Sequence, residues 1–197
     1  MTSLGTILAI LISSVLIDNY IFSRFLGICP FLGLSDKPST AVGMGCAVTF
    51  VMTLSTAFTW LIYTFILVPL ELEYLKTIAF ILIIASLVQI IEMFLRKAVP
   101  SLYSALGIYL PLITTNCAIL GAAILCIQNG FNFIESIIFS FGSAVGWTMA
   151  IVIFAGVRAR VNFSAPPKCF KGTPIALVSA CLIAMAFAGF QGVELPF

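Results

Sequence analysis

The sequence predicts an all-α integral membrane protein with six transmembrane helices, and three observations predict it. Of the 197 residues, 62% are hydrophobic and 8% are charged, whereas soluble domains average about 45–50% apolar and about 25% charged residues. The apolar residues form stretches long enough to cross a bilayer, which takes about 20 residues. Proline, glycine and charged residues separate these stretches. A soluble fold has too little polar surface to cover so many apolar side chains, so the bilayer is the expected solvent.

Six apolar stretches have the length of membrane spans, and the whole chain, 1–197, is expected to form one membrane domain. The first stretch is expected to be retained as a span, because it lacks a basic leader segment and no small-residue cleavage site follows it. The formal net charge of +2 is small and dispersed, so it gives no indication of nucleic-acid binding. The expected spans are 3–24, 40–68, 75–95, 102–126, 133–157 and 173–192.

Lysine and arginine are concentrated in alternate connections between the spans, and this predicts the orientation of the chain. Cytoplasmic loops carry an excess of these two residues. The second and fourth connections contain only Lys76, which stands near Glu71 and Glu73. The first, third and fifth connections are therefore expected to face the cytoplasm, and both termini the outer side. Those three connections contain Lys37; Arg96 and Lys97; and Arg158, Arg160, Lys168 and Lys171.

Two of the apolar stretches contain residues that do not suit a continuous helix. After the first span, residues 25–33 read FLGICPFLG, in which Pro30 lacks a backbone N–H and disfavours helical backbone at the residue before it. In the fourth span, Pro111 and the polar run TTNC at 114–117 interrupt an apolar helix. Broken helices occur at membrane depth where they pack in protein or line a cavity. Helices 1 and 4 are therefore predicted to be broken, and the breaks mark a candidate site.

The two interrupted stretches share a pattern that predicts an internal repeat. CPFLG at 29–33 and CAILG at 117–121 both read C-x-x-L-G. The two halves of the chain, about 1–97 and 98–197, hold three spans each, so they must insert with opposite orientation. The sequence therefore predicts two inverted three-helix repeats, which bring the two repeated cysteines towards the membrane midplane from opposite sides.

The chain contains six cysteines and no histidine. Thiolate is therefore the only soft metal ligand available in quantity, and it suits iron–sulfur clusters, copper(I) or zinc. The repeated pair, Cys29 and Cys117, supplies two of the four cysteines that a cluster normally takes. Cys126 falls on the opposite face of a helix from Cys117. A second match between the two halves, TAVG at 40–43 and SAVG at 143–146, places Met149 opposite Cys46, so Cys46 has no cysteine counterpart. The remaining two ligands are therefore expected from a second, similar subunit.

Three segments of the chain together resemble one family of membrane proteins. They are FLGICPFLG at 25–33, ALGIYLPLITTNC at 105–117 and FGSAVGW at 141–147. These segments resemble the family that supplies membrane subunits to two complexes: the Rnf complex, an ion-translocating ferredoxin:NAD oxidoreductase, and the sodium-pumping NADH:quinone reductase. The Rnf member concerned is lettered A, and the quinone-reductase members are lettered D and E. The likeness extends over nearly the whole chain, and its CPF and TTNC details are more similar to the Rnf member.

The resemblance implies six helices in inverted repeats, paired with a homologous membrane subunit of opposite orientation, which is the one lettered E in Rnf. It implies a [2Fe–2S] cluster within the membrane that takes two ligands from each partner, here Cys29 and Cys117. The chain would be part of a translocase in a prokaryotic plasma membrane, without a complete active site of its own. It would carry electrons across the bilayer and couple ferredoxin:NAD oxidoreduction to Na⁺ or H⁺ translocation, while neighbouring subunits carry flavins and further iron–sulfur centres.

Residues around the breaks are candidates for a surrounding shell or an ion pathway. Backbone amides near Gly27, Gly33 and Asn116 are candidate hydrogen-bond donors to the cysteine sulfurs, since such bonds tune a metal centre. Asp18 lies late in the first span, and ionisable groups inside a membrane are functional candidates by default. Asp18 and Asn116 are thus expected near an ion pathway or in the shell around the cysteines.

Other interpretations of the same residues stay open. Unpaired cysteines are often buried and act as small hydrophobes, so both repeated thiols could simply pack. Inverted repeats with broken helices also describe secondary transporters, which bind their substrates at the breaks. On that interpretation Asp18, Thr114, Thr115 and Asn116 would coordinate an ion or a solute. A purely structural scaffold leaves the paired polar breaks unexplained.

Overall fold

The computed structural model describes residues 4–35, 38–98, 110–163, 167 and 170–189, and this part of the chain contains helices and turns but no β-strand. The fold is therefore all-helical over the described residues, as the sequence predicts. In chain order the elements are α1 (Leu4–Ile12), the π-helix η1 (Ser13–Ile17), α2 (Ile28–Leu34), α3 (Pro38–Ile62), the π-helix η2 (Tyr63–Leu67), the 3₁₀-helix η3 (Glu73–Leu75), α4 (Lys76–Ala98), α6 (Leu110–Thr114), α7 (Cys117–Gln128), α8 (Phe133–Phe163) and α9 (Thr173–Ala188).

Three helical segments are long and apolar enough to cross a membrane, and they coincide with the second, third and fifth predicted spans. They are Pro38–Leu67, Glu73–Phe94 and Phe133–Val161. Three shorter apolar helices, Ile7–Ile17, Leu112–Gln128 and Thr173–Ala188, occur at the first, fourth and sixth predicted spans. The beginning of the fourth predicted span and the end of the sixth lie outside the described residues.

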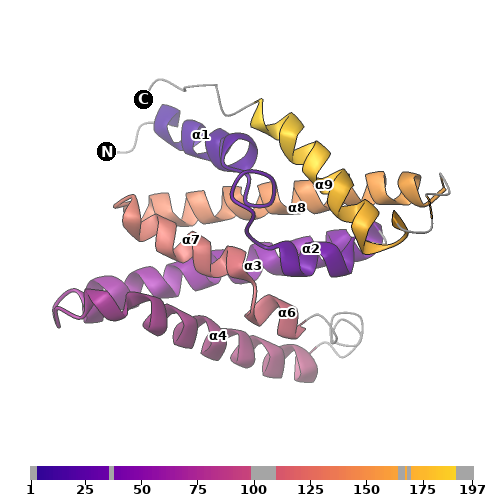
Figure 1. The fold of residues 1–197 in the computed structure, drawn as a ribbon. Helices are drawn as coiled ribbons and strands as arrows, with labels where there is room; N and C mark the ends of the chain where they lie inside the picture. The colour runs from indigo at the N-terminus through magenta and orange to yellow at the C-terminus, as the bar shows by residue number, and fades with distance from the viewer. Residues whose placement is uncertain (1–3, 36–37, 99–109, 164–166, 168–169, 190–197) are drawn as a thin grey trace.

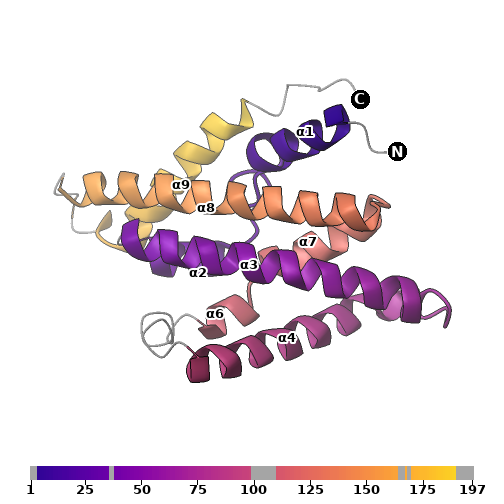
Figure 2. The same ribbon diagram turned by 180° about the vertical axis from the view of Figure 1, so that it is seen from behind.

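The two longest helices, α3 and α8, run antiparallel and side by side through the molecule (Figures 1 and 2). The helices α4 and α6 lie on one side of this pair, and α1 and α9 lie on the other (Figure 1). The short helices α2 and α7 begin near the centre and run to opposite ends of the molecule (Figures 1 and 2). The breaks in the first and fourth apolar stretches therefore meet in the interior rather than at the ends of the helices.

Large apolar side chains divide between a buried core and the outer surface. The core is centred on α8, where Trp147 and Phe154 are fully buried, and the Phe154 ring stacks on Phe31 of α2 with centroids 4.2 Å apart. Other large side chains face outward, such as Phe65 and Met93, which are 70% and 71% exposed. Soluble monomers rarely expose large apolar patches, whereas a membrane chain presents such side chains to lipid.

The first apolar stretch breaks earlier than predicted, and the proline is not the cause. The π-helix η1 is followed by turns over residues 18–27, whereas the predicted span runs to residue 24. Pro30, the expected cause, lies in the first turn of α2, where a backbone N–H would have no acceptor within the helix. The turns contain two residues with left-handed backbone, Phe25 at φ 55° and Gly27 at φ 82°. The break is therefore made by the turn residues.

The fourth apolar stretch is interrupted within the predicted polar run, between α6 and α7. Thr115 and Asn116 are not helical, whereas Pro111 lies within α6. Asn116 is the N-cap of α7, and its Oδ1 accepts the backbone N–H of Ala118 at 3.1 Å. An asparagine in this position stabilises a helix start by about 1 kcal/mol relative to alanine. The interruption therefore starts a new helix with Cys117 as its first residue.

Two glycines on α8 allow the first helix to lie directly against it. A Cβ placed on Gly142 would clash with Oγ of Ser14, and a Cβ on Gly146 would stand 2.9 Å from the carbonyl oxygen of Val15. Both partners belong to η1. Small residues four apart permit such close backbone approach in membrane helices. This glycine face of α8 is therefore the surface against which the end of the first helix packs.

Asn19, the second residue after η1, connects the break to the glycine face of α8 by hydrogen bonds. It is fully buried, and its Nδ2 donates to the carbonyl oxygens of Gly146 at 2.9 Å and Val15 at 3.2 Å. Its Oδ1 accepts the backbone N–H groups of Ile21 and Phe22. One side chain thus satisfies backbone groups of η1, of the turns that form the break and of α8, which is what non-helical backbone at membrane depth requires.

We expect Gly146→Val to lower the stability of the protein by roughly 1–3 kcal/mol. The added side chain would meet backbone atoms of Val15, which cannot rotate away. The measurement is the thermal unfolding midpoint of the purified protein in detergent. Gly156→Val is the control on the same helix, because a Cβ there meets nothing within 4 Å. Equal losses in the two variants would contradict the close contact between η1 and α8.

Candidate functional site

The two breaks meet at one hydrogen bond to a cysteine sulfur. The backbone N–H of Gly27 donates to Sγ of Cys117, with 2.9 Å between nitrogen and sulfur. Cys117 is the first residue of α7 and is half-buried, whereas Cys29 is the second residue of α2 and is exposed. The structure thus places the repeated cysteines at the starts of two helices that run to opposite ends of the molecule (Figures 1 and 2).

Only glycine suits the position of Gly27. Its φ of 82° is unfavourable for residues with a Cβ, and a Cβ there would clash with Nε1 of Trp147 and stand 3.2 Å from Cβ of Ala118. The preceding side chain, Leu26, fills the space beside Gly121, where a Cβ would come within 2.7 Å of Leu26 Cδ1. The segment before α2 is therefore fitted against α7 and α8 on both sides, and this fit aims the Gly27 N–H at the sulfur.

The C-terminal end of α2 is held by an arginine of α8. Nη1 of Arg158 donates to the carbonyl oxygen of Leu32 at 2.9 Å and to Oγ of Ser35 at 2.8 Å. A positive charge is favourable near the last carbonyl groups of a helix. The helix that carries Cys29 is therefore fixed to α8 at its far end, in addition to the fit around Gly27 at its start.

The side chains around Cys117 supply N–H donors. Besides the Gly27 amide, two buried donors have no hydrogen-bond partner among the described residues, Nδ2 of Asn116 and Nε1 of Trp147. The N-terminus of α7 also favours negative charge. Thiolates surrounded by N–H donors are the environment that iron–sulfur centres have in proteins. The surroundings of Cys117 therefore fit one thiolate ligand of such a centre.

The described residues do not complete a metal site within this chain. They contain no group of three or more cysteine, aspartate or glutamate side chains placed to hold a metal ion. Cys126 is buried and its thiol lies 3.7 Å from the carbonyl oxygen of Ser136, while Cys46 and Cys181 are exposed on α3 and α9. Of these three thiols, only that of Cys126 is buried.

Asp18 lies at a separate cavity on the other side of the first break. Its Oδ1 pairs with Nη2 of Arg24 at 3.0 Å, and both side chains are more than one-third exposed. The cavity has a volume of about 300 Å³ and is lined by polar and aromatic side chains. These are Ser13, Asp18, Asn129, Phe131, Glu135 and Phe139, together with Ile10. The carboxylate of Asp18 therefore forms an ordinary ion pair rather than part of the cysteine junction.

Gly33, the other glycine expected near the sulfurs, is exposed on α2, and a Cβ there would meet nothing within 4 Å. Three residues have positioning roles that the sequence did not reveal: Asn19, Trp147 and Arg158. In the sequence, each of these residues is marked only by a polar group that lies in or beside an apolar stretch. The partner that gives each of them a role lies on another helix, so the signal alone does not reveal the role.

The fold and the site define a class of protein, a polytopic integral membrane protein with interrupted helices and paired cysteines at the breaks. Residues 7–194 match the family described as "Rnf-Nqr subunit, membrane protein". The chain belongs to this family, so the resemblance found in the sequence is confirmed.

Several curated relatives match the chain over nearly its full length. One is the A component of the Na(+)-translocating ferredoxin:NAD(+) oxidoreductase complex of Acetobacterium woodii. It is 59% identical over 190 residues, which cover 96% of this chain and 99% of that protein. Another, the A component of the ion-translocating oxidoreductase complex of Syntrophotalea carbinolica, is 56% identical over 94% of this chain and 96% of that protein. A protein of the same name from Azoarcus is 50% identical with the same coverage.

We expect Gly27→Ala to destabilise the protein more than Gly130→Ala. Both glycines have positive φ, at 82° and 65°, so both variants carry the backbone penalty of roughly 1–2 kcal/mol. Only the Cβ at position 27 meets other atoms, because nothing lies within 4 Å at Gly130. The excess loss is expected to be roughly 1–3 kcal/mol. The measurement is thermal unfolding, with the alkylation rate of Cys117 as a second readout that should rise only in Gly27→Ala.

Proposed function

We propose that this chain is a membrane subunit of an ion-translocating electron-transport complex and carries electrons across the membrane through a [2Fe–2S] cluster. The proposed ligands from this chain are Cys29 and Cys117. The observation that carries the proposal is the Gly27 N–H donated to Cys117 Sγ at the junction of the two breaks. The relatives described above are named as subunits of ion-translocating oxidoreductase complexes, which supports the same role.

Two thiolates of this chain leave two positions of a four-cysteine site open. We propose that a homologous membrane subunit of opposite orientation, the one lettered E in the Rnf complex, supplies the other two. The exposure of Cys29 supports this arrangement, because an exposed thiol at the start of α2 can face a neighbouring subunit. The opposite directions of α2 and α7 support the inverted repeats, with halves of about 1–97 and 98–197.

When bound, the [2Fe–2S] group would accept and release one electron at mid-depth, which divides a hydrocarbon core of about 30 Å into two shorter transfers. The chain's own residues hold and shield that position. The buried side chains of Trp147 and Ala118 close the side of the junction that faces the core. The Gly27 N–H stabilises negative charge on Cys117 Sγ, because hydrogen bonds to a charged acceptor are stronger than neutral ones.

The chain lacks an active site for the overall reaction on this proposal. Ferredoxin and NAD chemistry, flavins and further iron–sulfur centres belong to neighbouring subunits of the complex. The complex lies in a prokaryotic plasma membrane with both termini of this chain on the outer side. It couples ferredoxin:NAD oxidoreduction to the movement of Na⁺ or H⁺, and the turns over 18–27 and 115–116 are the segments expected to shift with the redox state.

The transporter alternative receives less support from the same residues. The side-chain oxygen of Asn116 already accepts a backbone N–H, and Asp18 already pairs with Arg24. Thr114 and Thr115 also have interaction partners. A solute site at the breaks would have to displace these contacts, whereas a ligand at Cys117 Sγ would keep the hydrogen bond from Gly27.

The test is iron content and low-temperature EPR of the purified complex after reduction with dithionite. We expect Cys29→Ala and Cys117→Ala to lose one [2Fe–2S] signal and about two iron atoms per complex, since each removes a thiolate ligand. Cys46→Ala is the matched control, because Cys46 is an exposed cysteine on a helix like Cys29. Full iron and an unchanged spectrum in the first two variants would refute the cluster, and the transporter interpretation would then be pursued.

A further inference from the structure

Two buried N–H donors at the cysteine junction have no acceptor in the part of the chain that the structure describes. Nε1 of Trp147 and Nδ2 of Asn116 are without hydrogen-bond partners there, and the two residues are 0% and 3% exposed. The only other tryptophan, Trp60, donates its Nε1 to the carbonyl oxygen of Phe131 at 3.1 Å. Buried polar groups in native proteins nearly always have partners, so the orphaned donors of Trp147, which packs against Gly27, and of Asn116, which precedes Cys117, require an explanation.

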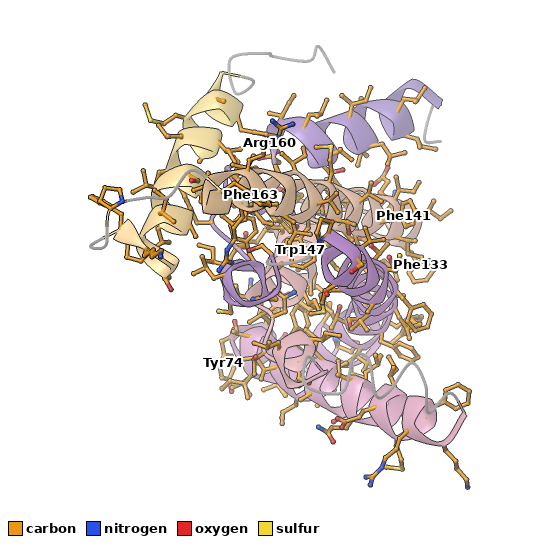
Figure 3. All side chains as sticks on the ribbon, turned by 90° about the vertical axis from the view of Figure 1, so that its right-hand side faces the viewer. Tyr74, Phe133, Phe141, Trp147, Arg160 and Phe163 are labelled. Carbon is orange, nitrogen blue, oxygen red and sulfur yellow. The ribbon has the colours of Figure 1, made fainter. Side chains whose placement is uncertain are left out.

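The indole of Trp147 directs its N–H edge at the junction. A Cβ built on Gly27 would meet Nε1 and, at 3.1 Å, the neighbouring Cδ1 of this ring, so the edge that carries the N–H faces the Gly27 backbone. Gly27 in turn donates to Cys117 Sγ. Figure 3 shows Trp147 in the interior of the packed helices. The orphaned donor of Trp147 therefore packs against Gly27, the residue whose N–H binds Cys117 Sγ.

The orientation of the Asn116 amide is fixed by its other atom. Oδ1 accepts the N–H of Ala118 and caps α7, so Nδ2 must be the free end. Lipid supplies no acceptor for either donor, and leaving them unpaired in the membrane interior is costly. A group that arrives when the protein is assembled would supply the acceptor that the described residues lack. The sulfur atoms of a centre bound at Cys29 and Cys117 are electron-rich groups at this place.

We propose that Trp147, together with Asn116, donates N–H hydrogen bonds to the sulfur atoms of the centre at Cys29 and Cys117 and thereby raises its reduction potential. This inference rests on the proposed function. Reduction adds one electron and one negative charge to the centre. N–H donors stabilise the more negative state more strongly, and hydrogen bonds to sulfur are an established control of the potential of such centres.

The sharpest test removes one N–H donor and keeps the ring. Trp147 is replaced in the assembled complex by β-(3-benzothienyl)alanine, in which sulfur stands where the indole has its N–H. The midpoint potential is then measured by EPR during a titration with dithionite. We expect reduction to become less favourable by roughly tenfold, a shift of about 59 mV to lower potential for one electron. The same replacement at Trp60 is the control and should leave the potential unchanged.

A second variant tests the other donor and does not depend on the tryptophan. Asn116→Ser keeps a good N-cap for α7 but removes the Nδ2 donor, so the potential should again fall while the thermal stability stays close to that of the native complex. Trp147→Phe should lower the potential in the same direction. The [2Fe–2S] signal itself is expected to remain in all of these variants, because none of them removes a thiolate.

Two negative results would have different meanings. A cluster signal that depends on Cys29 and Cys117, with a potential unchanged in the benzothienyl and Asn116→Ser proteins, would overturn this inference and leave the proposed function intact. A complex whose iron and spectrum do not depend on those cysteines would overturn both. A fall in potential at Trp60 equal to that at Trp147 would show a general effect of the replacement and would also count against a local hydrogen bond.

Discussion

The close contact between η1 and the glycine face of α8 is the constraint on which the rest of the interior depends. Because Gly142 and Gly146 lack side chains, the backbone of the first helix approaches α8 directly, and Asn19 then binds the following turn to the Gly146 carbonyl. The turn has to begin where this contact ends. Its length brings Gly27 to the sulfur of Cys117.

One helix, α8, makes contacts at the beginning, the middle and the end of the first break and α2. Along α8, Gly146 receives the end of the first helix, Trp147 limits the space around Gly27, and Arg158 holds the end of α2. These contacts follow one another in order along α8, as do their partners along the first third of the chain. A long straight helix thus serves as the rigid element against which a non-helical segment keeps a defined shape within lipid, where loose backbone is not tolerated.

The sequence predicts the helices well and the break less well, for a physical reason. Apolar length and flanking charge are local properties, so the stretch at 40–68 agrees closely with the helical segment Pro38–Leu67. The effect of a proline depends on its place within a helix, and Pro30 falls in a first turn, where it is harmless. The buried hydrogen bond that holds the turn to α8, from Asn19, involves a carbonyl 127 residues away. The repeated cysteines could be selected from their pattern, whereas Trp147 and Arg158 gain their roles only from the folded arrangement.

The separation between Asn19 and its partner on α8 also has a consequence for biosynthesis. Ribosomes add roughly 5–20 residues per second, so the 127 residues that separate the two positions correspond to roughly 6–25 seconds of translation. During that interval the N-terminal segment exists without its binding surface. Its turn carries backbone groups that the bilayer interior cannot solvate. The turn can therefore be buried against α8 only after the fifth hydrophobic stretch has been synthesised.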